Sequence, residues 1–237
     1  MDIMAIAASG MQQDLLRMES ISQNMANVRT PGYKKQIVVG APFAQQVDLA
    51  MTQPASDRPP VALSIDPSAA TMRYTGNVRD AAIEGGEFFE IAGPNGVAFT
   101  RQSGFHTDAR GRLVGAQGWP VMGRGGEITL TGAYTIDANG DVRQGDQVVG
   151  RLNLTRFENP ADLIPVGGGM YRQGAARVVD GATTAKIRLG YEENSNVNSP
   201  QEMVRLTETV RHFESLQKII QGYDDSLEKT IRKLGEF

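Results

Sequence analysis

The chain is 237 residues long, and its 24 Lys and Arg against 27 Asp and Glu give a formal net charge of −3 at pH 7. This weakly acidic balance argues against a nucleic-acid partner, while 40% hydrophobic and 22% charged residues are typical of a folded globular protein. The chain has no cysteine, which excludes disulfides and cysteine-ligated metals, and no stretch reaches the roughly 18 apolar residues that a membrane span needs.

The first element that the sequence predicts is an amphipathic helix over residues 1 to about 28. Methionines recur at every seventh position, and two further apolar side chains lie on nearby faces. The helix should end near Asn27, because Thr30-Pro31-Gly32 follows and a proline disfavours the helical conformation of the residue before it. The apolar residues of this predicted helix are Met4, Met11, Leu15, Met18, Ile21 and Met25.

A linker and a β domain should follow. Residues 35–74 are rich in proline, which predicts an extended linker that carries the chain from helix to sheet. Beyond it, glycines are dense from Gly76 to Gly190, and they bound short apolar runs such as Phe88-Phe89-Glu90-Ile91. Short runs between turn signals are typical of strands, so residues 75–192 are predicted to form a β-rich central domain.

Turn signals within this domain predict hairpins. Asn95-Gly96 and Asn139-Gly140 are dipeptides preferred in two-residue hairpin turns, in which both central residues take positive φ. Residues 108–111 indicate another turn. We therefore expect antiparallel strand pairs on either side of these positions.

A second long helix is predicted within residues 193–237. Ser199-Pro200 supplies a cap and a first-turn proline. Apolar side chains then repeat every seven residues in two rows, the pattern of a coiled-coil seam. Gln217 and Asp224 interrupt one row, which favours packing against several neighbours over a simple dimer. The rows are Leu206, Phe213, Ile220, Leu227 and Leu234, and Met203, Val210 and Ile231.

Together these elements predict an α+β fold, with a β-rich central domain and N- and C-terminal α-helices that pair as a coiled-coil-like assembly domain. Four parts are expected: a helix and its end motif in 1–34, the linker in 35–74, the β-rich domain in 75–192 and an assembly helix in 193–237. Helices of about 28 to 38 residues extend for roughly 42 to 57 Å. Because that is longer than a lid on a compact domain needs, the helices are expected to reach other molecules.

The end of the first predicted helix carries a specific motif: an alanine–asparagine pair, then threonine, proline, glycine, an aromatic and a basic residue. It resembles the N-terminal signature of the flagellar rod and hook family. The residues of this motif are Asn24, Ala26, Asn27, Thr30, Pro31, Gly32 and Tyr33. Further matches follow in order at Thr75-Gly76, Phe88-Phe89, Thr100-Arg101, Gly104-Phe105, Gly111 to Val114, and Ser195-Asn196-Val197-Asn198 before the last helix.

The resemblance implies a structural subunit of the bacterial flagellar basal-body rod. Such a subunit polymerises through its terminal helices into the hollow helical drive shaft that transmits torque from motor to hook. The implied partners are the protein itself, other rod proteins and the flagellar type III export machinery, with no nucleic acid and no membrane span. The implied location is the rod in the periplasmic space, reached without a cleaved signal peptide. The chain length favours a proximal-rod or distal-rod type, and a hook-type subunit of the same family is the alternative.

Two short clusters of polar residues suggest other classes of function. A hydrolase could use Ser103, His106 and Asp108, but no nucleophile elbow surrounds the serine, and residues on a strand entering a turn explain the cluster. Asp137, Asn139 and Asp141 have the spacing of the first ligands of an EF-hand loop, yet the glycine falls at the fourth position instead of the sixth, and Val148 occupies the twelfth position, where the loop needs an acidic ligand. The sequence therefore predicts no enzyme, no metal and no cofactor.

Overall fold

The computed structural model describes residues 3–40, 61–181 and 185–235. The chain divides into two compact units. The helical unit consists of Met1–Gln23, Ile37–Leu63 and Ser199–Phe237, and the β unit consists of Asn24–Gln36 and Ser64–Asn198.

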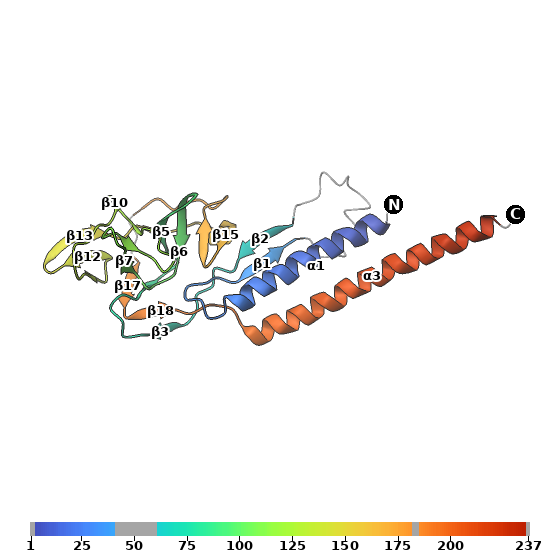
Figure 1. The fold of residues 1–237 in the computed structure, drawn as a ribbon, viewed down its shortest axis with the longest axis horizontal. Helices are drawn as coiled ribbons and strands as arrows, with labels where there is room; N and C mark the ends of the chain where they lie inside the picture. Colours follow the sequence, from blue (N-terminus) through green and yellow to red (C-terminus); the bar gives the residue numbers. More distant parts are fainter. Residues whose placement is uncertain (1–2, 41–60, 182–184, 236–237) are drawn as a thin grey trace. The chain divides into compact units, whose positions relative to one another are not determined.

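Two long helices dominate the helical unit. Helix α1 spans Ile3–Ala26 and helix α3 spans Ser199–Gly235, and the two pack together side by side (Figure 1). The proline at the start of α3 and the Thr30-Pro31-Gly32 turn after α1 lie where the sequence predicts them. The predicted α+β fold, with paired terminal helices and a β-rich centre, is confirmed.

The predicted linker over residues 35–74 contains short strands where the structure describes it. Strands β1 (Gln36–Val39) and β2 (Ala62–Ile65) pair as a two-stranded sheet, and β3 (Met72–Tyr74) pairs with β18 (Tyr191–Glu193). The middle of the predicted linker, residues 41–60, lies outside the described residues.

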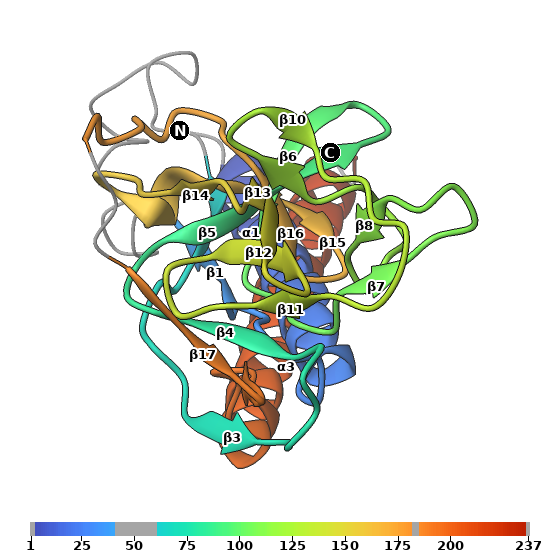
Figure 2. The same cartoon turned by 90° about the vertical axis from the view of Figure 1, so that its left-hand side faces the viewer.

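The β unit is built around a five-stranded antiparallel sheet with the order β14-β5-β6-β16-β15. A three-stranded sheet, β11-β12-β13, and several two-stranded ribbons complete the unit (Figure 2). The five strands of the larger sheet are β14 (Leu154–Thr155), β5 (Phe88–Gly93), β6 (Gly96–Thr100), β16 (Met170–Arg172) and β15 (Ile164–Gly167). The others are β4 (Ala81–Glu84), β7 (His106–Thr107), β8 (Leu113–Val114), β9 (Met122–Gly123), β10 (Gly126–Glu127), β11 (Thr135–Ile136), β12 (Asp141–Gln144), β13 (Gln147–Arg151) and β17 (Lys186–Leu189), with a 3-10 turn at Pro160–Asp162.

The paired aromatics on β5 explain how this sheet is covered on both sides. Neighbouring side chains on a strand point to opposite faces, and both Phe88 and Phe89 are fully buried. Phe89 packs edge-on against Phe105 in one core cluster, with ring centroids 4.9 Å apart. Phe88 packs against Phe157 and Tyr171 in a second cluster. The two adjacent phenylalanines therefore anchor two separate cores.

The predicted hairpins are present, but their turn type differs from the prediction. Among the described residues only glycines have positive φ, so the expectation of positive φ at both asparagines is wrong. Between β5 and β6 the loop residues are Pro94-Asn95, because Gly93 pairs with Gly96, and the proline ring fixes a negative φ. Between β11 and β12 the loop is longer, and only its glycine is left-handed.

An aspartate side chain shapes the β11–β12 loop. The Oδ1 atom of Asp137 accepts hydrogen bonds from the amides of Asn139 (2.8 Å) and Asp141 (3.0 Å), and Gly140 adopts φ 83°. The β7–β8 turn has the same arrangement, since the side chain of Asp108 accepts hydrogen bonds from two backbone amides and Gly111 has φ 78°. Such side-chain-to-backbone bonds organise turns that a dipeptide preference alone does not describe.

A buried ionic cluster joins three distant segments of the β unit. The carboxylate of Glu193 accepts from Lys34 Nζ at 2.8 Å and from Arg101 Nε at 2.5 Å. The remaining donors of Arg101 reach the carbonyls of Glu87 (2.6 Å) and Ile83 (3.1 Å). All three charged side chains are at most 4% exposed. One carboxylate therefore pairs with both buried cations.

The cluster shifts the pKa values of its members in defined directions. Burial alone would raise the pKa of Glu193, but the charges of Arg101 and Lys34 and the hydrogen bonds to the carboxylate outweigh it, and the pKa lies below its usual value. Burial lowers the pKa of Lys34, and the attraction of Glu193 only partly opposes it. The ionised carboxylate is thus the form that the fold stabilises.

Replacing this carboxylate should destabilise the β unit strongly. The Glu193→Gln substitution leaves two buried cations without a counter-charge, and breaking a buried ion pair in this way costs about 3–5 kcal/mol. The matched control is Glu192→Gln, whose partner Arg73 is 61% exposed, so the loss should stay below about 1 kcal/mol. Urea denaturation, followed by the fluorescence of Trp119, the single tryptophan, measures the free energy of unfolding of each variant. Equal losses in the two variants would contradict the role of the cluster.

The same cluster predicts an acid-sensitive stability. Because the folded-state pKa of Glu193 lies below its unfolded value, the stabilisation is complete above the unfolded pKa of about 4.3 and is lost as the pH falls through the folded pKa. The free energy of unfolding should therefore fall with acidification below about pH 4. The free energy of unfolding of Glu193→Gln should depend less on pH in this range than that of the wild type. Equal dependence on pH would show that Glu193 is not the group responsible.

Candidate functional site

The motif that follows α1 is held by the side chain of Asn24. Its Oδ1 atom accepts hydrogen bonds from the hydroxyl of Tyr33 (3.1 Å) and the amide of Gln36 (2.8 Å), and its Nδ2 atom donates to the carbonyl of Gln36 (2.9 Å). Asn24 is buried, so these bonds are formed away from water. One asparagine therefore fixes the reversal of the chain after the helix.

Gly32 occupies a position in this motif that no side chain can take. Its φ is 67°, and a Cβ atom there would lie 2.4 Å from the backbone carbon and oxygen of Arg101. Its amide donates to the carbonyl of Glu193 at 2.7 Å. The glycine thus allows the turn to approach two other segments closely. Beside it, Thr30 closes the turn by donating from Oγ1 to the side chain of Asn27 at 3.1 Å.

The structure brings the N-terminal motif together with the C-terminal motif, Ser195–Asn198. Asn196 accepts from the amide of Lys35 at Oδ1 (2.6 Å) and donates from its own amide to the carbonyl of Tyr33 (3.4 Å). Its Nδ2 atom donates to the carbonyl of Asp66 (3.0 Å). Val197 is buried. Of the other motif residues, Pro31 is half-buried, as is Ser195, while Ala26 and Asn198 are exposed. The two motifs form one hydrogen-bonded joint, which we call the motif joint.

The contact between α1 and α3 is more polar than the sequence suggested. Asp14 is fully buried, and its carboxylate binds His212 Nδ1 at 2.5 Å and Arg17 Nη1 at 2.9 Å. On α3 the buried residues recur every seventh position and begin with polar side chains. They are Glu202, Thr209 and Leu216. Sequence reasoning missed this row because its first two members are polar, although the seven-residue spacing was present.

The apolar rows predicted for the helices are only partly covered. Half-buried members are Phe213 and Ile220 on α3 and Met4, Met11, Met18 and Met25 on α1, and Ile21 is buried. Exposed members are Leu15, Met203, Leu206, Val210, Leu227 and Ile231, and the side chain of Leu234 lies outside the described part. The helical unit thus leaves an extensive apolar surface open.

Of the residues of the hydrolase alternative, Asp108 organises the β7–β8 turn. Ser103 is buried, and His106 is exposed with Nδ1 3.5 Å from the carbonyl of Gly104. Both carboxylate oxygens of Asp108 are engaged, one by two backbone amides and the other by Arg112 Nε at 2.9 Å. The side chains do not form a relay from serine to histidine to aspartate.

The two aspartates of the calcium alternative also bond to neighbouring protein groups. Asp137 holds its own loop, and Asp141 forms a bidentate pair with Arg151. Within the described residues no group of three His, Asp or Glu side chains is arranged to hold a metal ion. Among the same residues, no helix has the length and hydrophobicity to cross a membrane.

Three protein-family models match successive parts of the chain. Residues 4–34 match "Flagella basal body rod protein", residues 82–144 match "Flagellar hook protein FlgE/F/G D1 domain", and residues 188–233 match "Flagellar basal body rod FlgEFG protein C-terminal". The first and last matches include the two halves of the motif joint.

Curated relatives match along nearly the full length. The flagellar basal-body rod protein FlgF of Mesorhizobium japonicum is 29% identical over 99% of this chain and 98% of its own, and FlgF of Caulobacter vibrioides is 30% identical over 92% of each. The rod protein FlgG of Bacillus subtilis is 29% identical over 94% of this chain and 95% of its own. With its paired terminal helices and β-rich centre, the chain belongs to the flagellar basal-body rod protein family and is a structural rod subunit rather than an enzyme.

Proposed function

We propose that this rod subunit polymerises through its terminal helices into the hollow helical shaft that transmits torque from motor to hook. The observation that carries the proposal is the apolar surface of α3. Met203, Leu206 and Val210 are 57%, 39% and 36% exposed on a helix whose buried row, Glu202, Thr209 and Leu216, is a different one. Contiguous exposed apolar side chains of this kind mark protein interaction sites.

The motif joint supports a mechanical role. Asn24 connects the end of α1 to the segment that follows it, and Asn196 connects that segment to the one before α3, through buried or partly buried hydrogen bonds. A shaft that carries torque needs subunits whose connections do not yield, and a closed hydrogen-bond network limits local bending. We assign this role to the seven residues of the N-terminal motif and to Ser195–Asn198.

The location and partners follow from the same proposal. The full-length similarity to rod proteins supports the basal-body rod in the periplasmic space as the location. Other copies of this chain and other rod proteins are the proposed partners, and the flagellar type III export apparatus is the proposed route. The similarity to both FlgF and FlgG proteins supports a proximal-rod or distal-rod type over the hook type.

Charge placed on the exposed apolar row should separate assembly from folding. Leu206→Asp puts a charge at a side chain that is 39% exposed in the monomer, so the free energy of unfolding should change by less than about 1 kcal/mol. In the rod the same charge would be buried without a partner, and assembly should fail. The matched control is Ser215→Asp, on the side of α3 facing away from this row, which should assemble normally.

Electron microscopy of isolated basal bodies and motility assays measure the result, with expression levels of the variants matched. Intact rods and full motility in the Leu206→Asp strain would overturn polymerisation through this face. A large loss of monomer stability would show instead that the row belongs to the subunit's own core.

A further inference from the structure

A surface hollow in the β unit lies between the β5–β6 loop, the segment around Trp119 and the β15–β16 hairpin. Its volume is about 330 Å³, which is within the range of small-molecule binding sites. The hollow is lined by residues 93–96, Ala98, Trp119, Val166 and Arg172. None of these residues belongs to the motif joint or to the ionic cluster. We call this feature the Trp119 hollow.

The indole of Trp119 is held in place by the rest of the β unit. Trp119 is half-buried and packs against the core cluster that contains Phe89. The carbonyl of the next residue, Pro120, accepts a hydrogen bond from the amide of Ala92 on β5 (2.8 Å). A Cβ atom on Gly93 would lie 3.1 Å from the indole, so the glycine leaves the room that the ring fills. Because the ring is already ordered, a ligand that stacks on it costs little conformational entropy.

The β5–β6 loop forms a second wall and carries a side-chain amide. Gly93 pairs with Gly96 across the loop, and a Cβ atom on Gly96 would meet no atom within 4 Å. Asn95 lies between them and is exposed. Its amide offers both a donor and an acceptor, and it forms no hydrogen bond within the part of the chain that the structure describes. A ligand hydroxyl can therefore bind there without displacing an internal contact.

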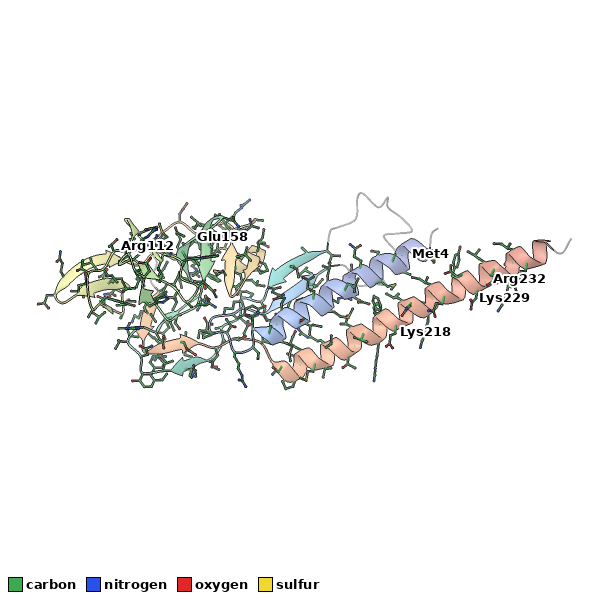
Figure 3. The ribbon with its side chains drawn as sticks, in the orientation of Figure 1. Met4, Arg112, Glu158, Lys218, Lys229 and Arg232 are labelled. Carbon is green, nitrogen blue, oxygen red and sulfur yellow. The ribbon has the colours of Figure 1, made fainter. Side chains whose placement is uncertain are left out.

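Arg172 supplies a cation that has no partner among the described residues. It is the last residue of β16 and is exposed, and no carboxylate in the described ranges pairs with it. Another arginine of the β unit does have such a partner: Arg112, labelled in Figure 3, binds Asp108 at 2.9 Å. A guanidinium binds a planar carboxylate through two parallel hydrogen bonds. The Trp119 hollow thus favours a ligand that carries a carboxylate.

We propose that the Trp119 hollow binds an acidic saccharide. A sugar ring stacks its apolar C–H face on the indole of Trp119, presents a hydroxyl or acetamido group to Asn95, and pairs its carboxylate with Arg172. A neutral sugar would leave the guanidinium unused, and an aromatic acid would leave the amide of Asn95 unused. Uronic acids and acidic amino sugars combine all three features. The site belongs to the β unit and does not depend on polymerisation through the helices.

The single tryptophan of the chain reports on this site directly. The purified full-length chain is titrated with digalacturonic acid and with N-acetylmuramic acid, and the fluorescence of Trp119 and its indole N–H signal in NMR spectra are recorded. We expect a saturable change in both signals with at least one acidic sugar, at a Kd of about 1 mM or lower. Maltose, a neutral disaccharide, should bind at least about tenfold more weakly, because it cannot form the charge-assisted bonds to Arg172.

Substitutions at exposed positions test the assigned contacts. Arg172→Gln should weaken binding of the acidic sugar at least about tenfold. Asn95→Asp should weaken it as well, because the new carboxylate competes for the guanidinium. The matched control is Arg177→Gln, which removes an exposed arginine of the β unit outside the hollow and should change the Kd by less than about twofold. All three variants should keep the urea midpoint of the wild type, since exposed positions tolerate such changes.

The absence of a response to either acidic sugar up to about 10 mM would overturn the inference. Equal affinities for maltose and the acidic sugars would also overturn it, because the carboxylate would then play no part. Equal losses in Arg172→Gln and Arg177→Gln would mean that the surface attracts anions in general and has no specific site. Tighter binding of phenylpropionate, an aromatic acid without hydroxyl groups, than of either sugar would rule out a saccharide as the ligand.

Discussion

The arrangement of the β unit depends on a single buried carboxylate. Glu193 accepts from Lys34 and Arg101, and its own backbone carbonyl accepts from Gly32. Removing two cations and an anion from water is expensive, and only close pairing with well-placed hydrogen bonds offsets that cost. The segment after α1, the strand region around Arg101 and the segment before α3 must therefore meet at one point. Other packings of these segments would leave a buried charge without a partner.

This constraint explains why the motif residues are small, polar or conformationally special. Gly32 is required because the backbone of Arg101 approaches it too closely for a side chain. Asn24 and Asn196 then satisfy the backbone groups that the close approach removes from water. The motif joint is thus a consequence of packing three backbones around the ionic cluster.

The contact between α1 and α3 and the exposed apolar side chains lie on different faces of the two helices. The buried contact between α1 and α3 contains Asp14 and His212 as a close pair, and polar groups in such a seam fix the register of two helices at some cost in stability. The apolar side chains lie largely outside this seam. The pairing within the subunit and the proposed contacts between subunits therefore use different faces of the same helices.

The elements that local signals control could be predicted from the sequence. Helix α1 ends at Ala26, shortly before Thr30-Pro31-Gly32, helix α3 begins with Ser199-Pro200, and the paired aromatics of β5 lie in a strand as expected. The ionic cluster could not be predicted, because Lys34, Arg101 and Glu193 resemble ordinary surface charges until the fold brings them together. The turn types could not be predicted either. Pro94 in one loop and the side chain of Asp137 in the other favour turns that differ from the two-residue turn typical of Asn-Gly dipeptides. The pairing of Asp14 with His212 could not be predicted either, because the spacing of apolar residues does not reveal polar residues that are buried between two helices.

The spacing of the three charged residues along the chain also affects the order of folding. Glu193 lies 159 residues after Lys34 and 92 residues after Arg101. Contacts between such distant residues slow folding, because a large loop must close before they form. In a chain that emerges from its N-terminus, both cations remain in water until the segment that carries Glu193 arrives. The β unit should therefore complete its folding late, in one cooperative step that waits for strand β18.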